Sequence, residues 1–131
     1  MSIRFAGYAA LFGRPDAIRD TIRPGAFLRT LTARKERLPL YWQHNAAQRI
    51  GWIERAEEDA RGLRVIARID NPMSRAAEML RRRTVSGLSF GYHARRFRRG
   101  AGGRVLEDVE LIEVSLVTRP LQHGARVHFI V

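Results

Sequence analysis

Cysteine is absent from this sequence of 131 residues, and lysine occurs once, as Lys35. A chain without cysteine forms no disulfide, has no thiolate nucleophile and offers no zinc–thiolate site. Long apolar runs are absent too, since none approaches the roughly 18 residues that a membrane-spanning helix needs. We therefore expect a soluble, intracellular protein that makes no contact with a membrane.

Histidine is scarce, with four residues at positions 44, 93, 123 and 128. These histidines form no HExxH motif and no other closely spaced ligand pair, which would be the usual signature of a zinc site. We expect no metal ion and no other cofactor.

Acidic residues are outnumbered, because 13 Asp and Glu face 24 Lys and Arg, for a formal net charge of +11. A balance of this kind favours acidic partners, including nucleic acid. The basic residues are scattered, however, and cluster only at Arg81 to Arg83 and at Arg95 to Arg99. We expect a solvated basic surface whose binding to nucleic acid is at most weak and non-specific.

Much of the chain shows the period-two alternation of apolar and polar residues that is typical of half-buried strands. The clearest case is 62–70, where Leu63, Val65, Ala67 and Ile69 share one face. Strands are predicted at residues 3–12, 38–44, 49–57, 62–70, 87–98, 104–118 and 125–131.

Two helices are predicted between these strands. The first covers residues 24–35 and has Phe27 and Leu28 among the residues on one face. The second follows the N-cap Ser74 and ends near Arg83. Successive strands joined by short turns, with two helices inserted, favour a mostly antiparallel sheet or barrel of the α+β class.

Ser89 lies in a segment that matches the GxSxG pattern, Gly87-Leu88-Ser89-Phe90-Gly91. In α/β-hydrolases this pattern joins a strand to a helix, whereas here an alternating strand follows, so we reject that fold. The glycines predict room for a substrate backbone and free N–H groups for an oxyanion. The alternative is a serine without function in a glycine-rich strand.

His44 ends the apolar run 38–44, and period-two counting puts it on the same face as Leu40 and Trp42. An imidazole exchanges protons near neutral pH, which suits a general base. A satisfied core histidine is the alternative.

Glu113 lies inside the segment 109–117. Apolar residues occur there at both odd and even positions, which predicts a strand buried on both faces. A buried carboxylate needs an ion pair or hydrogen bonds. We therefore expect Glu113 to have a histidinium or an arginine as its partner. Asp108 and Glu110 are rival acids in positions that we expect to be more exposed.

An ordered set of short motifs covers nearly the whole chain. In chain order the set comprises Phe5-Ala6-Gly7-Tyr8-Ala9 with Phe12-Gly13, Ile22-Arg23-Pro24-Gly25-Ala26-Phe27, Trp42-Gln43-His44 with Ile50-Gly51, Gly62-Leu63, Gly87-Leu88-Ser89-Phe90-Gly91, and Leu111-Ile112-Glu113-Val114-Ser115-Leu116-Val117-Thr118 with Pro120. This set resembles the prohead, or capsid-maturation, serine proteases of tailed phages of the HK97 type and of related gene-transfer agents. That family is distantly similar to the herpesvirus assemblins.

The resemblance implies a single protease domain over residues 1–131 with a mostly antiparallel, herpesvirus-protease-like β-barrel. It implies that the chain hydrolyses peptide bonds in scaffold and capsid proteins, inside the immature capsid in the host cytoplasm. Self-association into a homo-oligomer stays open. One departure from the family is the pair Leu121-Gln122, which stands where alanine and asparagine usually follow the proline.

By the same resemblance Ser89 is the nucleophile, His44 is its base and Glu113 is the third catalytic residue. Assemblins use a second histidine in the third place, so His123 or His128 stays open as an alternative. Two rival functions remain: a catalytically inactive capsid-assembly protein, and a basic β-barrel that binds nucleic acid through arginines and aromatic residues.

Overall fold

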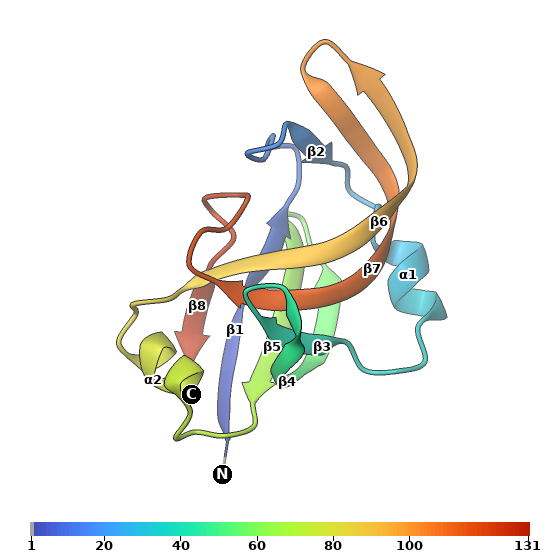
Figure 1. Ribbon diagram of the computed structural model, residues 1–131. Coiled ribbons are helices and arrows are strands. Elements are labelled where there is room, and N and C mark those ends of the chain that lie inside the picture. The colour runs from blue at the N-terminus through green and yellow to red at the C-terminus, as the bar shows by residue number, and fades with distance from the viewer. Residues whose placement is uncertain (1) are drawn as a thin grey trace.

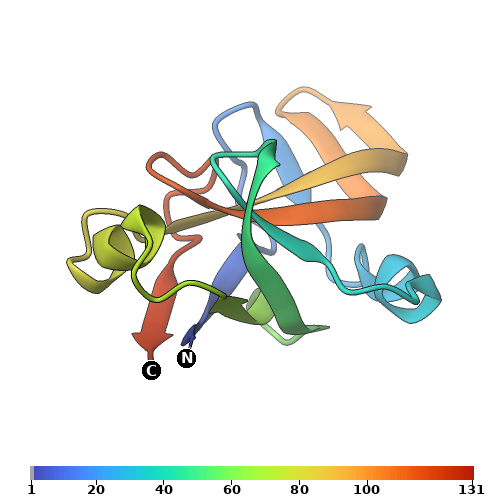
Figure 2. The same ribbon diagram turned by 60° about the horizontal axis from the view of Figure 1, so that its bottom comes forward.

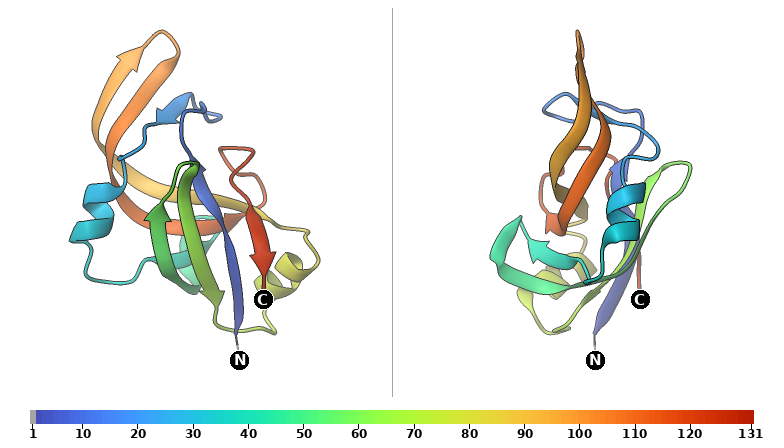
Figure 3. Two further views of the ribbon diagram at one scale, coloured as in Figure 1. Left: turned by 180° about the vertical axis from the view of Figure 1, so that it is seen from behind. Right: turned by 90° about the vertical axis from the view of Figure 1, so that its right-hand side faces the viewer.

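A curled sheet with two short helices at its margins makes up the computed structural model, which describes residues 2–131 (Figures 1 and 3). The prediction of a mainly β fold with two helices is confirmed. No helix within the described range is long and apolar enough to cross a membrane. The elements in chain order are β1 (Ile3–Leu11), β2 (Asp20–Ile22), α1 (Leu28–Ala33), β3 (Pro39–Trp42), β4 (Asn45–Glu58), β5 (Gly62–Ile69), α2 (Arg75–Arg81), β6 (Gly87–Gly100), β7 (Gly103–Val117) and β8 (Val127–Ile130).

Strand β7 connects β6 to the rest of the sheet. β6 pairs with it antiparallel over nearly its whole length. On its other edge β2 and β3 pair with it parallel, beside Arg104–Leu106 and Val114–Leu116 respectively. Across residues 2–131, five of the seven strand pairings are antiparallel. The sheet is therefore mostly antiparallel as predicted, and the two parallel pairings were not anticipated.

The sheet curls until its last strand approaches the start of β6. Beyond β7 the strand order runs β3-β4-β5-β1-β8. Gly87 forms a β-bridge with Arg126, and the Leu88 N–H donates to the Ala125 carbonyl at 2.9 Å. These contacts hold the half-barrel closed on one side, as the view along its lower end shows (Figure 2).

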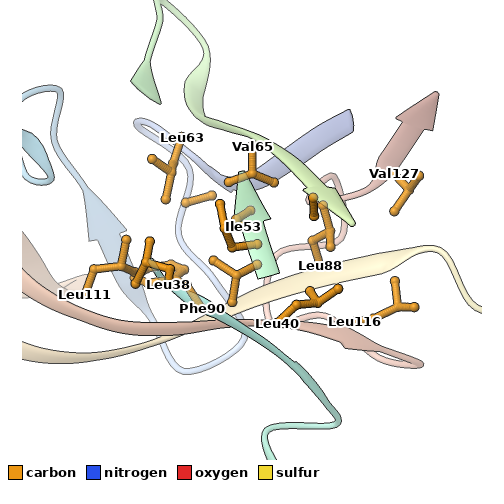
Figure 4. Packing of buried hydrophobic residues seen from close by; sticks show 14 of the residues in the cluster. Leu38, Leu40, Ile53, Leu63, Val65, Leu88, Phe90, Leu111, Leu116 and Val127 are labelled. Atoms are coloured by element: carbon orange, nitrogen blue, oxygen red, sulfur yellow. The ribbon is translucent and has the colours of Figure 1, made fainter. Parts of the chain in front are cut away.

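The apolar core fills the inside of this curl (Figure 4). Leu40, Ile53, Val65, Leu88 and Leu116 come from five consecutive strands, and each is at most 4% exposed. Truncation of such a leucine or isoleucine to alanine typically costs about 2–5 kcal/mol. The same packing fixes the relative positions of the strands that carry the polar residues described below.

The first helix is shorter than predicted from 24–35. Gly25 has a φ of +96°, a left-handed conformation that ends any regular helix. The Glu58 carboxylate accepts hydrogen bonds from the N–H groups of Gly25 and Phe27, both at 2.8 Å. These bonds stabilise a turn, so Phe27 is fully buried before the helix begins and Leu28 is 56% exposed. The expectation that Phe27 and Leu28 share a helix face is therefore wrong.

The second helix follows its predicted start. Ser74 is the N-cap, and its Oγ accepts a hydrogen bond from the Ala77 N–H at 3.1 Å. This is the usual way in which serine satisfies a free donor in the first helical turn. The helix ends at Arg81, two residues before the predicted end.

Strand β2 is fastened to its neighbours by a buried carboxylate. Asp20 is 2% exposed, and Arg104 donates to its two oxygens at 2.9 and 2.8 Å. The Tyr92 hydroxyl donates to Oδ2 at 2.7 Å. The Arg104 hydrogen bonds hold the pKa of Asp20 below its ordinary value. Burial and the carboxylate together raise the pKa of Tyr92.

Candidate active site

Ser89 lies on β6 directly opposite Ser115 of β7. Opposed residues in an antiparallel pair present their side chains on the same face, and so do residues two apart on one strand. Ser89, Ser115 and Glu113 therefore share a face. It is the face away from the main core, because the neighbours Leu88 and Phe90 belong to the apolar cluster.

A bulge in β7 makes this arrangement possible. Gly91 pairs with Glu113 and Tyr92 pairs with Leu111, which leaves Ile112 as an extra residue on β7. The bulge turns Leu111 and Glu113 to opposite faces, although simple alternation would give them the same one. Leu111 is fully buried in the core, and Glu113 is 4% exposed on the face of Ser89.

His44 lies in a two-residue turn between β3 and β4. Trp42 pairs with Asn45 across the turn, and the intervening Gln43 and His44 have φ values of 53° and 61°. Two consecutive left-handed residues are typical of a type I′ hairpin turn, which favours Asn-Gly. The expectation that His44 continues the strand and shares a face with Leu40 is therefore wrong.

The strained turn is anchored to the end of β7. The Gln43 N–H donates to the Leu116 carbonyl at 3.0 Å, and the His44 N–H donates to Ser115 Oγ at 3.1 Å. The Gln43 side-chain amide bonds Thr118 twice: Nε2 donates to Oγ1, and Oε1 accepts from the Thr118 N–H, each at 3.2 Å. Non-glycine residues in the left-handed region cost roughly 1–3 kcal/mol each, and these four bonds offset that cost.

The His44 ring and the Glu113 carboxylate are in direct contact. His44 Nδ1 lies 2.8 Å from Oε1 and 3.0 Å from Oε2, and Ser115 Oγ donates to Oε1 at 2.7 Å. A carboxylate at Nδ1 favours the tautomer with its proton on Nδ1, so Nε2 is the nitrogen that accepts a further proton. The prediction that Glu113 is buried and contacts His44 is confirmed.

Among the described residues no hydrogen bond joins Ser89 Oγ to His44, whose ring contacts Glu113 instead. Ser89 is 5% exposed, and its opposite residue Ser115 bonds the His44 backbone. The serine and the histidine thus lie on the same face of the β6–β7 pair. Catalytic hydrogen bonds are often long without substrate and tighten when it binds, so the Ser89–His44 bond stays a prediction.

The two alternative histidines lie elsewhere. His123 Nδ1 is 3.4 Å from Arg126 Nη2, and the His128 ring packs edge-on against Tyr8 with 5.7 Å between ring centroids. Within the described range neither ring forms a hydrogen bond with His44, whose Nδ1 faces Glu113. The second-histidine arrangement is therefore not formed by these residues.

The rival acids also have other partners. Arg29 lies between them, with its Nε 2.9 Å from Asp108 Oδ2 and its Nη2 3.5 Å from Glu110 Oε2. These are partly exposed ion pairs. Glu113 is the carboxylate that meets the His44 ring.

The glycines around Ser89 make room for neighbouring parts of the protein. A Cβ at Gly91 would lie 3.0 Å from the Glu113 carboxyl carbon, and one at Gly87 would lie 2.7 Å from Pro120 Cδ. That space holds parts of the protein itself, and the close approach of a substrate backbone stays a prediction. Gly91 leaves room for the Glu113 carboxylate.

Sequence reasoning missed three residues of the site. Ser115 bonds both Glu113 and the His44 backbone, and its position two residues after Glu113 on a strand is a signal that was available. Gln43 and Thr118 hold the turn, but they are 75 residues apart. No local pattern connects them.

A model of the family described as caudovirus prohead serine protease matches residues 1–131. The chain belongs to this family. The capsid polyprotein of Pseudomonas phage PAJU2 is 28% identical, over 86% of this chain and 18% of that protein. The chain thus spans about a fifth of the length of this relative.

Solved structures of two herpesvirus proteases resemble the fold. The KSHV protease in complex with a hexapeptide phosphonate inhibitor has a TM-score of 0.71 at 15% identity, covering 100% of this chain and 65% of that one. The varicella-zoster virus protease has a TM-score of 0.65 at 15% identity, covering 98% and 64%. At such identities the likeness concerns the fold, and the predicted herpesvirus-protease-like fold is confirmed.

Proposed function

We propose that the chain is a serine endopeptidase that cleaves scaffold or major capsid protein during procapsid maturation, acting as a single domain over residues 1–131. The observation that carries the proposal is the contact of a half-exposed His44 with the buried Glu113, on the face that Ser89 occupies. A purely structural ion pair could use an arginine, whereas a general base must be a group that can take up and release a proton, such as a histidine. Membership of a serine protease family supports Ser89 as the nucleophile.

The proposed reaction follows the usual acyl-enzyme sequence. Ser89 Oγ attacks the scissile carbonyl while its proton passes to His44 Nε2, and Glu113 holds the ring and stabilises its charged form. The proton then goes to the departing amine as the carbon–nitrogen bond breaks. Water, activated by the same imidazole, hydrolyses the ester on Ser89.

The oxyanion of the tetrahedral intermediates needs hydrogen-bond donors fixed in advance. Two groups are candidates: backbone N–H groups around Gly91, and the exposed side chain of Arg119, which follows β7. Replacement of Arg119 by alanine distinguishes them, since a side-chain donor lost from such a site lowers the rate by roughly 10²–10³.

The substrate proposal draws on the relative and on charge. The Pseudomonas phage PAJU2 protein is named a capsid polyprotein, which supports a capsid protein as substrate. A net charge of +11 favours acidic segments of scaffold as sites of retention. We place the reaction inside the immature capsid in the host cytoplasm.

The decisive experiment is co-expression of this chain with a major capsid protein from the same genome. The wild type should shorten the capsid protein at one site, which N-terminal sequencing identifies. Ser89→Ala should abolish the cleavage, and Ser86→Ala, a nearby serine outside the site, should retain it. Full-length capsid protein in assembled shells with every variant would instead indicate an inactive assembly protein.

Nucleic-acid binding is the weaker candidate. Many arginines are engaged in ion pairs on different strands, such as Arg4 with Glu54, Arg49 with Asp70 and Arg98 with Glu107. We expect any DNA affinity to fall steeply with salt, because counterion release would supply nearly all of it. Tight binding at physiological salt, or preference for one sequence, would favour a binding module.

A further inference from the structure

A groove of about 630 Å³ lies next to the catalytic residues without including them. One wall is the β3–β4 hairpin, with Trp42, Gln48 and Ile50, and the other is helix α2, with Ala76 and Met79. The end of β7 lies beside the turn of this hairpin, where the Gln43 N–H donates to the Leu116 carbonyl (Figure 1). The groove therefore begins where the proposed active site ends.

Gln43 and Thr118 also line the groove. Gln43 immediately precedes His44, and its side-chain amide bonds Thr118 in both directions. Ser89 and Glu113 do not line the groove. Two of its lining residues, Gln43 and Thr118, thus belong to the contacts that hold the turn carrying His44.

In the proposed reaction the amine of the leaving group departs next to His44. The imidazole must donate its proton to that nitrogen. The residues of the substrate that follow the scissile bond therefore leave past His44, toward Trp42 and Gln43. A groove in this place is suited to hold them.

The lining of the groove indicates what it binds. Trp42, Ile50, Ala76 and Met79 offer apolar surface, and no lining residue is a carboxylate. Arg75 lies on the α2 side, is exposed and forms no ion pair with any residue from 2 to 131. Because an unpaired cation beside an apolar surface favours an acidic neighbour, the lining suits an apolar side chain followed by a carboxylate.

We infer that this groove is the binding site for the leaving-group side of the substrate, and that it selects an apolar residue directly after the scissile bond with an acidic residue next to it. The inference rests on the proposed Ser89 protease function. Trp42 and Met79 contact the apolar side chain, and Arg75 pairs with the acid.

Acyl transfer tests this assignment without knowledge of the cleavage site. p-Nitrophenyl acetate acetylates Ser89: the Ser89 Oγ–carbon bond forms, the bond to p-nitrophenolate breaks, and the serine proton passes through His44 to the leaving group. An added amine then attacks the acetyl carbon, releasing Ser89 with its proton restored. By microscopic reversibility the amine binds where a leaving amine departs.

The probes are Leu-Glu-amide, Leu-Lys-amide and Gly-Glu-amide, and acetylated peptide is measured against free acetate. We expect Leu-Glu-amide to intercept the acetyl-enzyme about fivefold better than Leu-Lys-amide, as partly exposed ion pairs allow. It should exceed Gly-Glu-amide about tenfold, because the leucine side chain is partly buried. Arg75→Glu should reverse the preference between Glu and Lys, and Arg75→Ala should remove it.

The matched control is Arg14→Glu, which changes the charge equally at an exposed arginine outside the groove; it should keep the wild-type preference. Equal interception by all three amides, with Ser89 still acetylated, would overturn the groove assignment alone. A preference for Glu that survives Arg75→Glu would do the same. If mass spectrometry finds no acetyl group on Ser89, the proposed function fails and the inference fails with it.

Discussion

Two carboxylates are buried against β7, near opposite ends of the strand, and they differ in the partner that satisfies them. Asp20 is 2% exposed and pairs with Arg104, a permanent cation, with a hydrogen bond from the Tyr92 hydroxyl. Glu113 is 4% exposed and pairs with His44, with a hydrogen bond from the Ser115 hydroxyl. Each carboxylate thus has one basic side chain and one hydroxyl group as its partners.

The difference lies in whether the partner can exchange a proton. A guanidinium stays protonated in proteins, so Asp20 and Arg104 form a fixed clamp between β2 and β7. An imidazole gains and loses its proton near neutral pH, and the His44 side chain is 42% exposed. The same local solution to a buried charge therefore serves stability at one end of β7 and, as we propose, catalysis at the other.

The largest expected effect is on catalysis at Glu113. Glu113→Gln keeps the size of the side chain but removes the charge and offers the wrong partner to Nδ1, so cleavage should fall by roughly 10⁴. The measurement is the rate of capsid-protein cleavage by purified protein, with thermal unfolding to verify folding. The matched control is Glu110→Gln, which should lose little activity, since Glu110 pairs with Arg29. Full activity of Glu113→Gln would show that His44 needs no carboxylate.

The opposite pattern is expected at Asp20. Asp20→Asn leaves Arg104 without its carboxylate, which should lower the free energy of unfolding by about 2–3 kcal/mol, given that Arg104 is partly exposed. For a chain of this length that corresponds to a melting temperature about 8 °C lower. Activity per folded molecule should be retained. Asp108→Asn, which breaks an exposed pair, should have a smaller effect. A loss of activity in Asp20→Asn without a loss of stability would contradict the comparison.

Sequence patterns predicted one of these carboxylates and not the other. Glu113 stands inside an apolar strand, where a charge requires a partner, and that argument was sufficient to predict its burial. Asp20 lies in a short polar segment and meets Arg104 84 residues later through a parallel pairing. No local pattern signals such a contact, and neither parallel pairing of β7 was predicted.

The position of His44 could not be predicted from periodicity either. Gln43 and His44 both adopt left-handed conformations. Glycine and asparagine favour such conformations, and neither occurs at these two positions. Tertiary hydrogen bonds to β7 impose the turn against local preference. The family motif still identified His44, because such a resemblance reflects the folded site and not the local propensity.

The pH dependence of stability offers a further test of the fixed clamp. Because hydrogen bonds from Arg104 lower the pKa of Asp20, the folded state holds the ionised carboxylate better than the unfolded chain, whose aspartates have a pKa of about 3.9. The stabilisation is complete above that value and is lost as the pH falls below it toward the folded pKa. Urea unfolding at pH 6 and pH 3 should show a larger loss in the wild type than in Asp20→Asn. Equal losses would mean that Asp20 is not the group responsible.

The smallest effect is expected at the turn that holds the histidine in place. Gln43→Ala removes both side-chain hydrogen bonds to Thr118, which should cost about 1 kcal/mol of stability. A loosened turn should also slow acetylation of Ser89 by p-nitrophenyl acetate about tenfold, because His44 is then less well aligned. This ester is too small to extend into the neighbouring groove, so its rate reports on the histidine.

Thr118→Val is the matched variant for the same contact. It removes the Oγ1 acceptor but keeps the backbone N–H that donates to Gln43 Oε1, so the loss of acetylation rate should be about half as large on a logarithmic scale. If Gln43→Ala acetylates Ser89 as fast as the wild type, the backbone bonds to Leu116 and Ser115 suffice to align His44. The Glu113 end of β7 would then resemble the Asp20 clamp more closely, since in both places the strand and the buried carboxylate would fix the geometry without the Gln43 side chain.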